Sequence, residues 1–143
     1  MTQNKIMVAI DGSEYSYKVI DKAIEYARLL NGEVLLVYCH RKFPRILGQP
    51  HKDQIISAIM DETKEVVEPF VKRLKEAKIE FIKRFMEEPA SEMISKVAAH
   101  EECNLIIMGC RGLTDLEGLL IGSITHRVLQ TAPCSVLVVR GDN

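Results

Sequence analysis

The sequence lacks the features that mark membrane proteins and nucleic-acid-binding proteins. No apolar run approaches the ~20 residues that a membrane-spanning helix needs. The 143 residues carry 19 lysines and arginines against 20 aspartates and glutamates, a net charge of −1, whereas nucleic-acid binding usually requires a basic surface. The N-terminal residues lead into a strand-like run without a signal-peptide cleavage site. We therefore expect a cytoplasmic protein with no membrane or nucleic-acid partner.

The cysteines are too few and too scattered to indicate a zinc site. They form no CxxC pair and no Cys/His pair at ligand spacing. The simplest interpretation is that all four are small, reduced and mostly buried side chains. Cys110, which lies between two glycines of a loop, is the candidate for a reactive thiol, although most such thiols are inert. The four are Cys39, Cys103, Cys110 and Cys134.

Short apolar runs alternate with helical patterns along the chain. Five apolar runs predict strands at residues 5–10, 34–39, 79–85, 104–108 and 135–139. Apolar residues at the helical period predict four helices, at about 13–30, 55–77, 89–102 and 123–131. Ser13 is expected to cap the first helix and Gly32 to end it. Residues 40–54 predict a long irregular loop, and Pro69 predicts a kink or a restart in the second helix.

This alternation predicts a single α/β domain over residues 1–143. The expected architecture is a three-layer sandwich with a five-stranded, mostly parallel sheet. Ligands of such sheets bind beyond the carboxyl ends of the strands, where the strand order reverses. The segments to inspect therefore follow the first, second and fourth strands, at residues 11–12, 39–40 and 109–112.

A glycine motif follows the fourth strand, at the end of the sheet where a ligand is expected. Gly109 and Gly112 are followed, after nine intervening residues, by Gly122 and Ser123. Glycine lets backbone N–H groups approach a ligand closely, and a helix start supplies unpaired donors and partial positive charge. The motif therefore predicts a cradle for the phosphates of a nucleotide. The same residues also fit a purely structural role, with a tight turn at the glycines and a helix cap at Ser123.

Other residues near the motif leave the nature of the site open. Asp115 and Glu117 would repel phosphates if they faced them, and the lysine motif GxxxxGKS/T is absent. Backbone N–H groups, Arg111 and a divalent cation such as Mg²⁺ would then have to balance the phosphate charge, with Asp11 or Asp115 as a metal-binding carboxylate. Asp11 also fits a cap just outside the first helix, and Arg111 fits a solvated loop cation.

The chain resembles the universal stress protein family, in its nucleotide-binding branch with the pattern G-x2-G-x9-G-S/T. The resemblance covers essentially the whole chain and is carried by the glycine motif and the segments 6–13, 105–112 and 132–139. It implies an adenine nucleotide alpha hydrolase-like, Rossmann-like fold that binds ATP or another adenine nucleotide. One departure is local: the family often has Gly-x-Pro where this chain has two glutamates before Pro89.

The resemblance also implies which residues meet the nucleotide. It places Asp11 near the nucleoside and the backbone of Tyr38 against the adenine, and it wraps the glycine segment around ribose and phosphates. Ala9 belongs to the set and stands where some members have proline. The full set is Ala9, Asp11, Tyr38, Met108, Gly109, Arg111, Gly112, Gly122, Ser123 and Ile124.

These features favour a nucleotide-binding regulatory or stress-response protein. His40 and His126 are the candidates for catalysis, but nothing in the sequence completes a triad or a metal cluster around them. Slow ATP hydrolysis stays open as an alternative, although the SGGxDS-type loop of related hydrolases is missing after the first strand. A phosphoacceptor receiver domain is excluded because the third strand ends without a candidate aspartate.

The last predicted strand suggests how copies of the chain associate. Residues 136–139 are apolar on both faces, yet the last strand is expected at an edge of the sheet. Such an edge invites pairing with another chain, and the resemblance implies the same contact. We therefore expect a homodimer through Ser135 to Val139, the alternative being a helix or loop that covers the edge.

Overall fold

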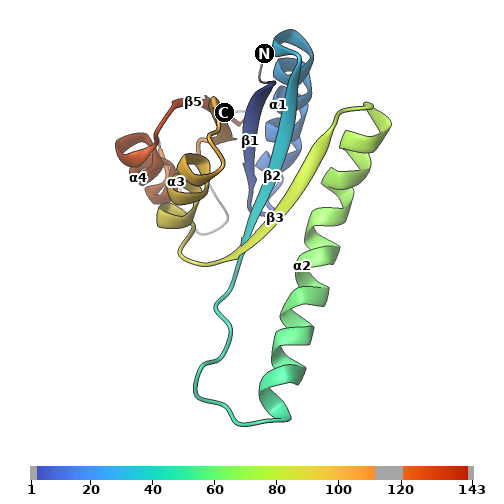
Figure 1. Cartoon of the computed structure of the whole chain (residues 1–143), viewed down its shortest axis with the longest axis vertical. Helices are drawn as coiled ribbons and strands as arrows, with labels where there is room; N and C mark the ends of the chain where they lie inside the picture. Colours follow the sequence, from blue (N-terminus) through green and yellow to red (C-terminus); the bar gives the residue numbers. More distant parts are fainter. Residues whose placement is uncertain (1–2, 112–120, 142–143) are drawn as a thin grey trace.

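The computed structural model describes residues 3–111 and 121–141 and contains one sheet of five parallel strands (Figure 1). The strands lie in the order β3-β2-β1-β4-β5. The α/β architecture predicted from the sequence is confirmed, and every strand pair is parallel. The strands are β1 (Asn4–Ile10), β2 (Gly32–His40), β3 (Phe81–Glu87), β4 (Leu105–Gly109) and β5 (Ser135–Val139).

In the part of the chain that the structure describes, two helices cover each face of the sheet. Helices α1 and α2 pack on one face and α3 and α4 on the other, which gives three layers (Figure 1). Helix α2 is the longest and extends past the carboxyl end of the sheet, together with the segment that connects it to β2. The helices are α1 (Tyr15–Leu30), α2 (His51–Glu76), α3 (Ala90–His100) and α4 (Ser123–Thr131). Within the described residues, no helix combines the length and the apolar character needed to cross a membrane.

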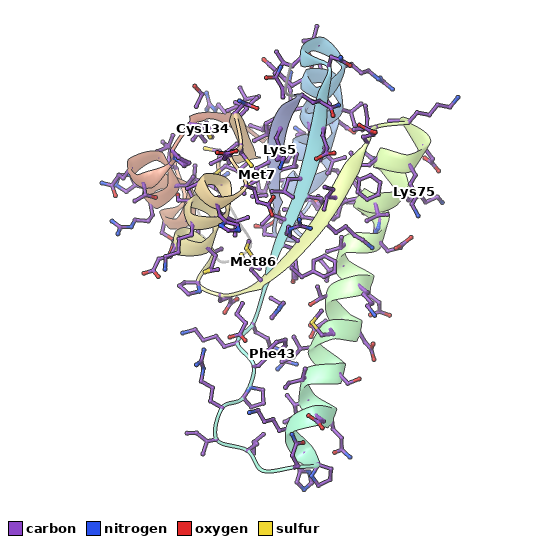
Figure 2. The ribbon with its side chains drawn as sticks, viewed as in Figure 1. Lys5, Met7, Phe43, Lys75, Met86 and Cys134 are labelled. Carbon is purple, nitrogen blue, oxygen red and sulfur yellow. The ribbon has the colours of Figure 1, made fainter. Side chains whose placement is uncertain are left out.

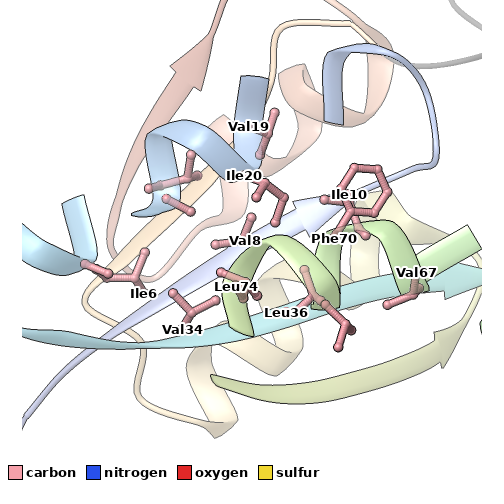
Figure 3. Close-up of a cluster of buried hydrophobic side chains, with 14 of the residues drawn as sticks. Ile6, Val8, Ile10, Val19, Ile20, Val34, Leu36, Val67, Phe70 and Leu74 are labelled. Carbon is pink, nitrogen blue, oxygen red and sulfur yellow. The ribbon is translucent and has the colours of Figure 1, made fainter. Parts of the chain in front are cut away.

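Strand β1 is buried on both faces, which explains its uninterrupted apolar sequence. Ile6 and Val8 point to the α1–α2 side, where they pack with Ile20 and Phe70 (Figure 3). Met7, between them in the sequence, belongs to the second core under α3 and α4, as the two-residue period of a strand requires. The sheet thus separates two apolar cores, and its carboxyl edge is the place where both cores end.

The ends of α1 differ from the prediction. Glu14, and not Ser13, is the N-terminal cap residue, and its side chain makes no capping hydrogen bond with the described residues. At the other end Asn31 has a φ of 51° and its N–H donates to the Ala27 carbonyl. Asparagine tolerates this left-handed conformation, so Gly32 is free to begin β2.

Helix α2 begins earlier than its apolar pattern indicates, so the connection from β2 is shorter than predicted. Its first turn is held by a polar pair: the Gln49 side-chain amide donates to Asp53 Oδ1 at 2.9 Å, and Asp53 N–H donates back to Gln49 Oε1 at 3.2 Å. Hydrophobic periodicity does not register such a contact. The helix also runs continuously through Pro69, so of the two predicted outcomes, a kink or a restart, the restart does not occur.

Strand β3 begins later than predicted because its first predicted residues still belong to the exit from α2. Ile79 N–H donates to the Leu74 carbonyl at 3.0 Å, and Lys78 has a φ of 58°. The strand itself is an edge of the sheet, as its partly polar pattern predicts.

Candidate functional site

A cavity of about 520 Å³ opens at the carboxyl edge of the sheet. Strand β1 pairs with β2 on one side and with β4 on the other, so the strand order reverses at this point, which is where ligands bind in sheets of this kind. Besides strand-end residues, the wall includes the starts of α1, α3 and α4. The lining residues used below are Ala9, Ile10, Asp11, Tyr15, Val19, Tyr38, Cys39, Lys42, Glu88, Ile94, Met108, Gly109, Arg111, Ile124 and Thr125.

Most of the residues expected from the sequence meet at this cavity. Ala9, Asp11, Tyr38, Met108, Gly109, Arg111 and Ile124 lie on its wall. Gly122 and Ser123 are close by but are not part of the lining, and Gly112, Asp115 and Glu117 lie outside the described residues.

The turn after β1 is built around Asp11. Its Oδ1 accepts hydrogen bonds from Ser13 N–H at 2.9 Å and from the Ser16 hydroxyl at 3.1 Å. Gly12 has a φ of 83°, and a Cβ there would lie 2.9 Å from Val66 Cγ1, so the turn requires glycine in both conformation and space. The Asp11 carboxylate therefore holds the turn that leads into α1, and Asp11 also forms part of the cavity wall.

The end of β4 is joined to the start of α4 by hydrogen bonds. Gly122 N–H donates to the Cys110 carbonyl at 2.8 Å, and the Thr125 hydroxyl donates to the Gly109 carbonyl at 2.7 Å. Gly122 is the cap residue of α4 and Ser123 is its first residue, so the predicted capping position of Ser123 is wrong by one. The Gly122 amide is therefore already bonded within the protein. The part of α4 that lines the cavity is its first turn, at Ile124 and Thr125.

Arg111 provides positive charge on the β4 side of the cavity. Its Nη2 donates to the Tyr15 hydroxyl at 3.1 Å, and its guanidinium carbon lies 5.9 Å from the centre of the Tyr15 ring. These contacts connect the end of β4 with the start of α1. A second cation, Lys42, and a carboxylate, Glu88, line the cavity beyond the ends of β2 and β3.

The β2 side of the cavity holds two groups that stay neutral. Burial raises the pKa of the Tyr38 phenol, and the carboxylates of Glu62, Asp11 and Glu88 raise it further. Burial, with a smaller effect of Glu88, raises the pKa of the Cys39 thiol to about 12. Cys39 is therefore a poor nucleophile at neutral pH.

The structure gives no support to either histidine as a catalytic group. His40 is buried, its Nδ1 lies 2.8 Å from the Arg41 carbonyl oxygen, and its ring stacks on Phe43 at 4.7 Å. Phe43 lies on the segment that leads from β2 to α2 (Figure 2). Neither His40 nor His126 lines the cavity. Residues 3–111 and 121–141 hold no group of three or more His, Cys, Asp or Glu side chains placed for a metal ion.

Several lining residues were missed by the sequence reasoning. Lys42 and Glu88 lie just beyond the ends of β2 and β3, where the rule about carboxyl ends of strands points. Glu88 was missed because the predicted end of β3, at residue 85, was two residues early. Tyr15 and Thr125 lie on the first turns of α1 and α4. No local signal marks them, because their place at the cavity depends on how the helices pack on the sheet.

A doubly wound parallel sheet with a cavity at its switch point places this chain among the α/β proteins whose ligands, where they have them, bind at that point. Residues 3–140 match the sequence model of the universal stress protein family. The chain belongs to this family.

Individual relatives agree with this assignment over most of their length. The universal stress protein YxiE of Bacillus subtilis is 29% identical, with 96% of this chain and 99% of the relative covered. The universal stress protein MJ0531 of Methanocaldococcus jannaschii is 31% identical, with 95% and 81% covered. Among solved structures, the hypothetical protein MJ0577 superposes with a TM-score of 0.86 at 25% identity, with 100% and 99% covered.

Three further structures of this fold contain adenine nucleotides. They are a universal stress protein in complex with cAMP, a family member from Arabidopsis thaliana with AMP bound, and the universal stress protein from Archaeoglobus fulgidus in complex with dAMP. Their identities to this chain are 20%, 14% and 18%, with TM-scores of 0.69, 0.71 and 0.69, and each match covers more than nine-tenths of both chains. At these identities the likeness establishes the shared fold.

Proposed function

We propose that this protein binds an adenine nucleotide, in the first place ATP, in the cavity at the carboxyl edge of its sheet, and that it acts as a regulatory stress-response protein. The observation that carries the proposal is the meeting of seven predicted site residues at one cavity, at the switch point of the sheet. The cavity volume of about 520 Å³ is typical of sites for small organic ligands. The nucleotides named for the three structural neighbours support the same ligand class.

The charges on the cavity wall suggest how the nucleotide is oriented. On the β4 side lie Arg111 and the first turn of α4, and the partial positive charge of a helix start attracts anions. On the β2 side the wall contains the neutral Tyr38 and Cys39 with Glu88 nearby. We therefore place the phosphates at Arg111 and α4 and the base beside β2. Mg²⁺ would enter with the phosphates, with Asp11 as the candidate protein ligand.

The proposed role is binding without dedicated catalysis. Neither histidine lines the cavity, and hydrolysis needs a group that activates or orients the attacking water. A regulator of this kind would change its interactions with nucleotide occupancy. Slow turnover of bound ATP is the alternative that the experiment must measure.

The decisive experiment identifies the ligand that the protein carries. One sample of protein purified without added nucleotide is denatured, and the small molecules that it releases are identified by mass. Binding and turnover of ATP are measured on a second sample, from which nucleotide has been removed without denaturation. Ala9→Leu, which places a larger side chain in the cavity wall, should abolish retention, whereas Ala99→Leu on the exposed side of α3 should not. Circular dichroism checks that both variants fold. Wild-type protein that neither carries nor binds ATP, ADP or AMP would refute the proposal.

We also propose that two copies pair through β5. This strand is an edge of the sheet, and Val136, Leu137 and Val138 are only partly buried although apolar. Val138→Lys should increase the monomer fraction in sedimentation, because a charge on the edge opposes strand pairing. Leu29→Lys, at a 71% exposed position of α1, is the control. An unchanged dimer in Val138→Lys would exclude this interface.

A further inference from the structure

The segment that connects β2 to α2 carries a block of positive charge. Residues 41–52 contain four lysines and arginines and no aspartate or glutamate, whereas the rest of the chain contains 15 lysines and arginines against 20 aspartates and glutamates. The near-neutral net charge is therefore an average over a basic segment and an acidic remainder. The four cations are Arg41, Lys42, Arg45 and Lys52.

Two neighbouring aliphatic side chains of the same segment are exposed. Ile46 is 99% exposed and Leu47 is 43% exposed, although isoleucine and leucine are among the residues most often buried. Phe43 behaves differently, since it is partly buried and its ring stacks on His40 at 4.7 Å. Packing within the protein thus accounts for Phe43 but not for Ile46 and Leu47.

The basic segment lies on the part of the molecule that projects beyond the sheet. Figure 1 shows the connection from β2 and the first turns of α2 extending past the carboxyl ends of the strands. A projecting surface of this kind cannot enclose a small ligand. It suits a partner with a broad surface that adapts to the projection.

The two arginines of the segment form exposed ion pairs. Arg41 Nη2 lies 3.6 Å from Glu62 Oε2, and Arg45 Nη2 lies 3.6 Å from Glu87 Oε2. The two arginine side chains are 60% and 79% exposed, and exposed pairs contribute little net free energy. Both guanidinium groups are therefore available to anions outside the protein. Lys42 is placed differently, because it lines the cavity.

An anionic lipid surface matches this combination of charge and apolar side chains. Basic side chains are attracted to anionic headgroups, and each contributes about fivefold in affinity. Apolar side chains beside them enter the boundary between headgroups and acyl chains. An acidic protein would satisfy the charges, but it would need a pocket shaped for the projecting Ile46. A lipid surface accommodates this side chain without such a pocket.

We propose that residues 41–52 form a docking surface for membranes that contain anionic lipid, with Ile46 and Leu47 among the lipids and the basic side chains at the headgroups. This is peripheral binding, which needs no spanning helix. It departs from the expectation of no membrane partner, because net charge and the lack of a spanning run do not describe a local surface. It is independent of nucleotide binding.

A single tryptophan can report the insertion, because the chain contains none. Ile46→Trp keeps a large apolar side chain at the docking surface, and Leu29→Trp, at a 71% exposed position of α1, is the matched control. Vesicles of phosphatidylcholine with about one third phosphatidylglycerol should shift the emission of Ile46→Trp to shorter wavelength, and brominated lipid should quench it. The emission of Leu29→Trp should stay unchanged.

Sedimentation with the same anionic vesicles measures the affinity. Ile46→Ser should bind about tenfold more weakly than wild type, and Arg45→Gln about fivefold more weakly. Leu29→Ser should bind as wild type does. Added salt should weaken the binding of wild type, because it screens the attraction to the headgroups. Circular dichroism checks that all variants fold.

The proposal is overturned by any of four results. These are no binding of wild type to the anionic vesicles, equal binding of wild type to vesicles of phosphatidylcholine alone, equal binding of Ile46→Ser and wild type, or an emission of Ile46→Trp that responds to soluble polyglutamate but not to vesicles. The last result would assign the segment to an acidic protein partner.

Discussion

Removal of the charge on Arg111 tests where the phosphates of the nucleotide lie. In Arg111→Gln the amide can keep a hydrogen bond to Tyr15, which Arg111 now contacts at 3.1 Å, so the change acts mainly on charge. A hydrogen bond to a charged group contributes about 1.5–3 kcal/mol. We expect ATP to bind about 10- to 100-fold more weakly. AMP, which carries less charge, should lose less than ATP.

The assay is calorimetric titration of AMP, ADP and ATP at two salt concentrations. Arg111→Lys, which keeps the charge, should recover much of the affinity for ATP. Lys42→Gln removes a cation from the β2 side of the cavity and should affect the three nucleotides to a similar extent. Added salt should weaken ATP binding to wild type more than to Arg111→Gln, because it screens the interaction that the variant lacks. An equal loss for AMP and ATP in Arg111→Gln would refute this orientation of the ligand.

Three further predictions concern stability. Burial raises the pKa of Cys39 to about 12 and that of Cys103 to about 11 from an ordinary 9.0. Between the ordinary and the raised pKa of each thiol, the unfolded chain releases a proton that the folded chain keeps. The unfolding free energy should therefore fall with rising pH in that range by about 1.4 kcal/mol per pH unit for each thiol. Urea unfolding of the double alanine variant should show a flatter alkaline profile, and an unchanged slope would contradict the argument. Phe70, which is 2% exposed, should cost about 3–5 kcal/mol on change to alanine, and a urea-measured loss below about 1 kcal/mol would contradict its place in the core. The Arg84 hydrogen bond to Glu101, at 3.0 Å, lowers the pKa of that carboxyl below its ordinary 4.5. The stabilisation from this pair is complete above pH 4.5 and is lost as the pH falls through the lowered pKa. Glu101→Gln should therefore make the urea-measured stability less sensitive to acid, whereas a profile identical to that of wild type would show that the pair contributes nothing.

The elements whose ends are marked by glycine or proline could be placed accurately from the sequence. Helix α4 and strand β5 fall at the predicted residues, because Gly122 and Pro133 mark the two ends of the helix. The start of α2 was missed because it depends on a side-chain pair, Gln49 with Asp53, that an apolar pattern does not contain. The start of β3 was missed because the Ile79 amide bonds back to the preceding helix.

The candidate site was predictable to the extent that it follows strand ends. Asp11, Gly109 and Arg111 were identified because each lies at or just beyond the end of an apolar run. The place of Thr125 on the cavity wall could not be predicted from the sequence, since it results from packing in three dimensions. The amide of Gly122 illustrates the same limit, because its bond to the Cys110 carbonyl depends on how α4 docks against β4.

The cavity wall draws on both apolar cores of the molecule. Ile10 and Val19 come from the core under α1 and α2, whereas Ile94 and Met108 come from the core under α3 and α4. A ligand bound there would contact residues of both cores at once and would stabilise the folded chain while it is bound. A ligand at 100 times its dissociation constant adds about 2.7 kcal/mol to the unfolding free energy. The stability of the folded chain, and hence its abundance in the cell, would then rise with the concentration of that ligand.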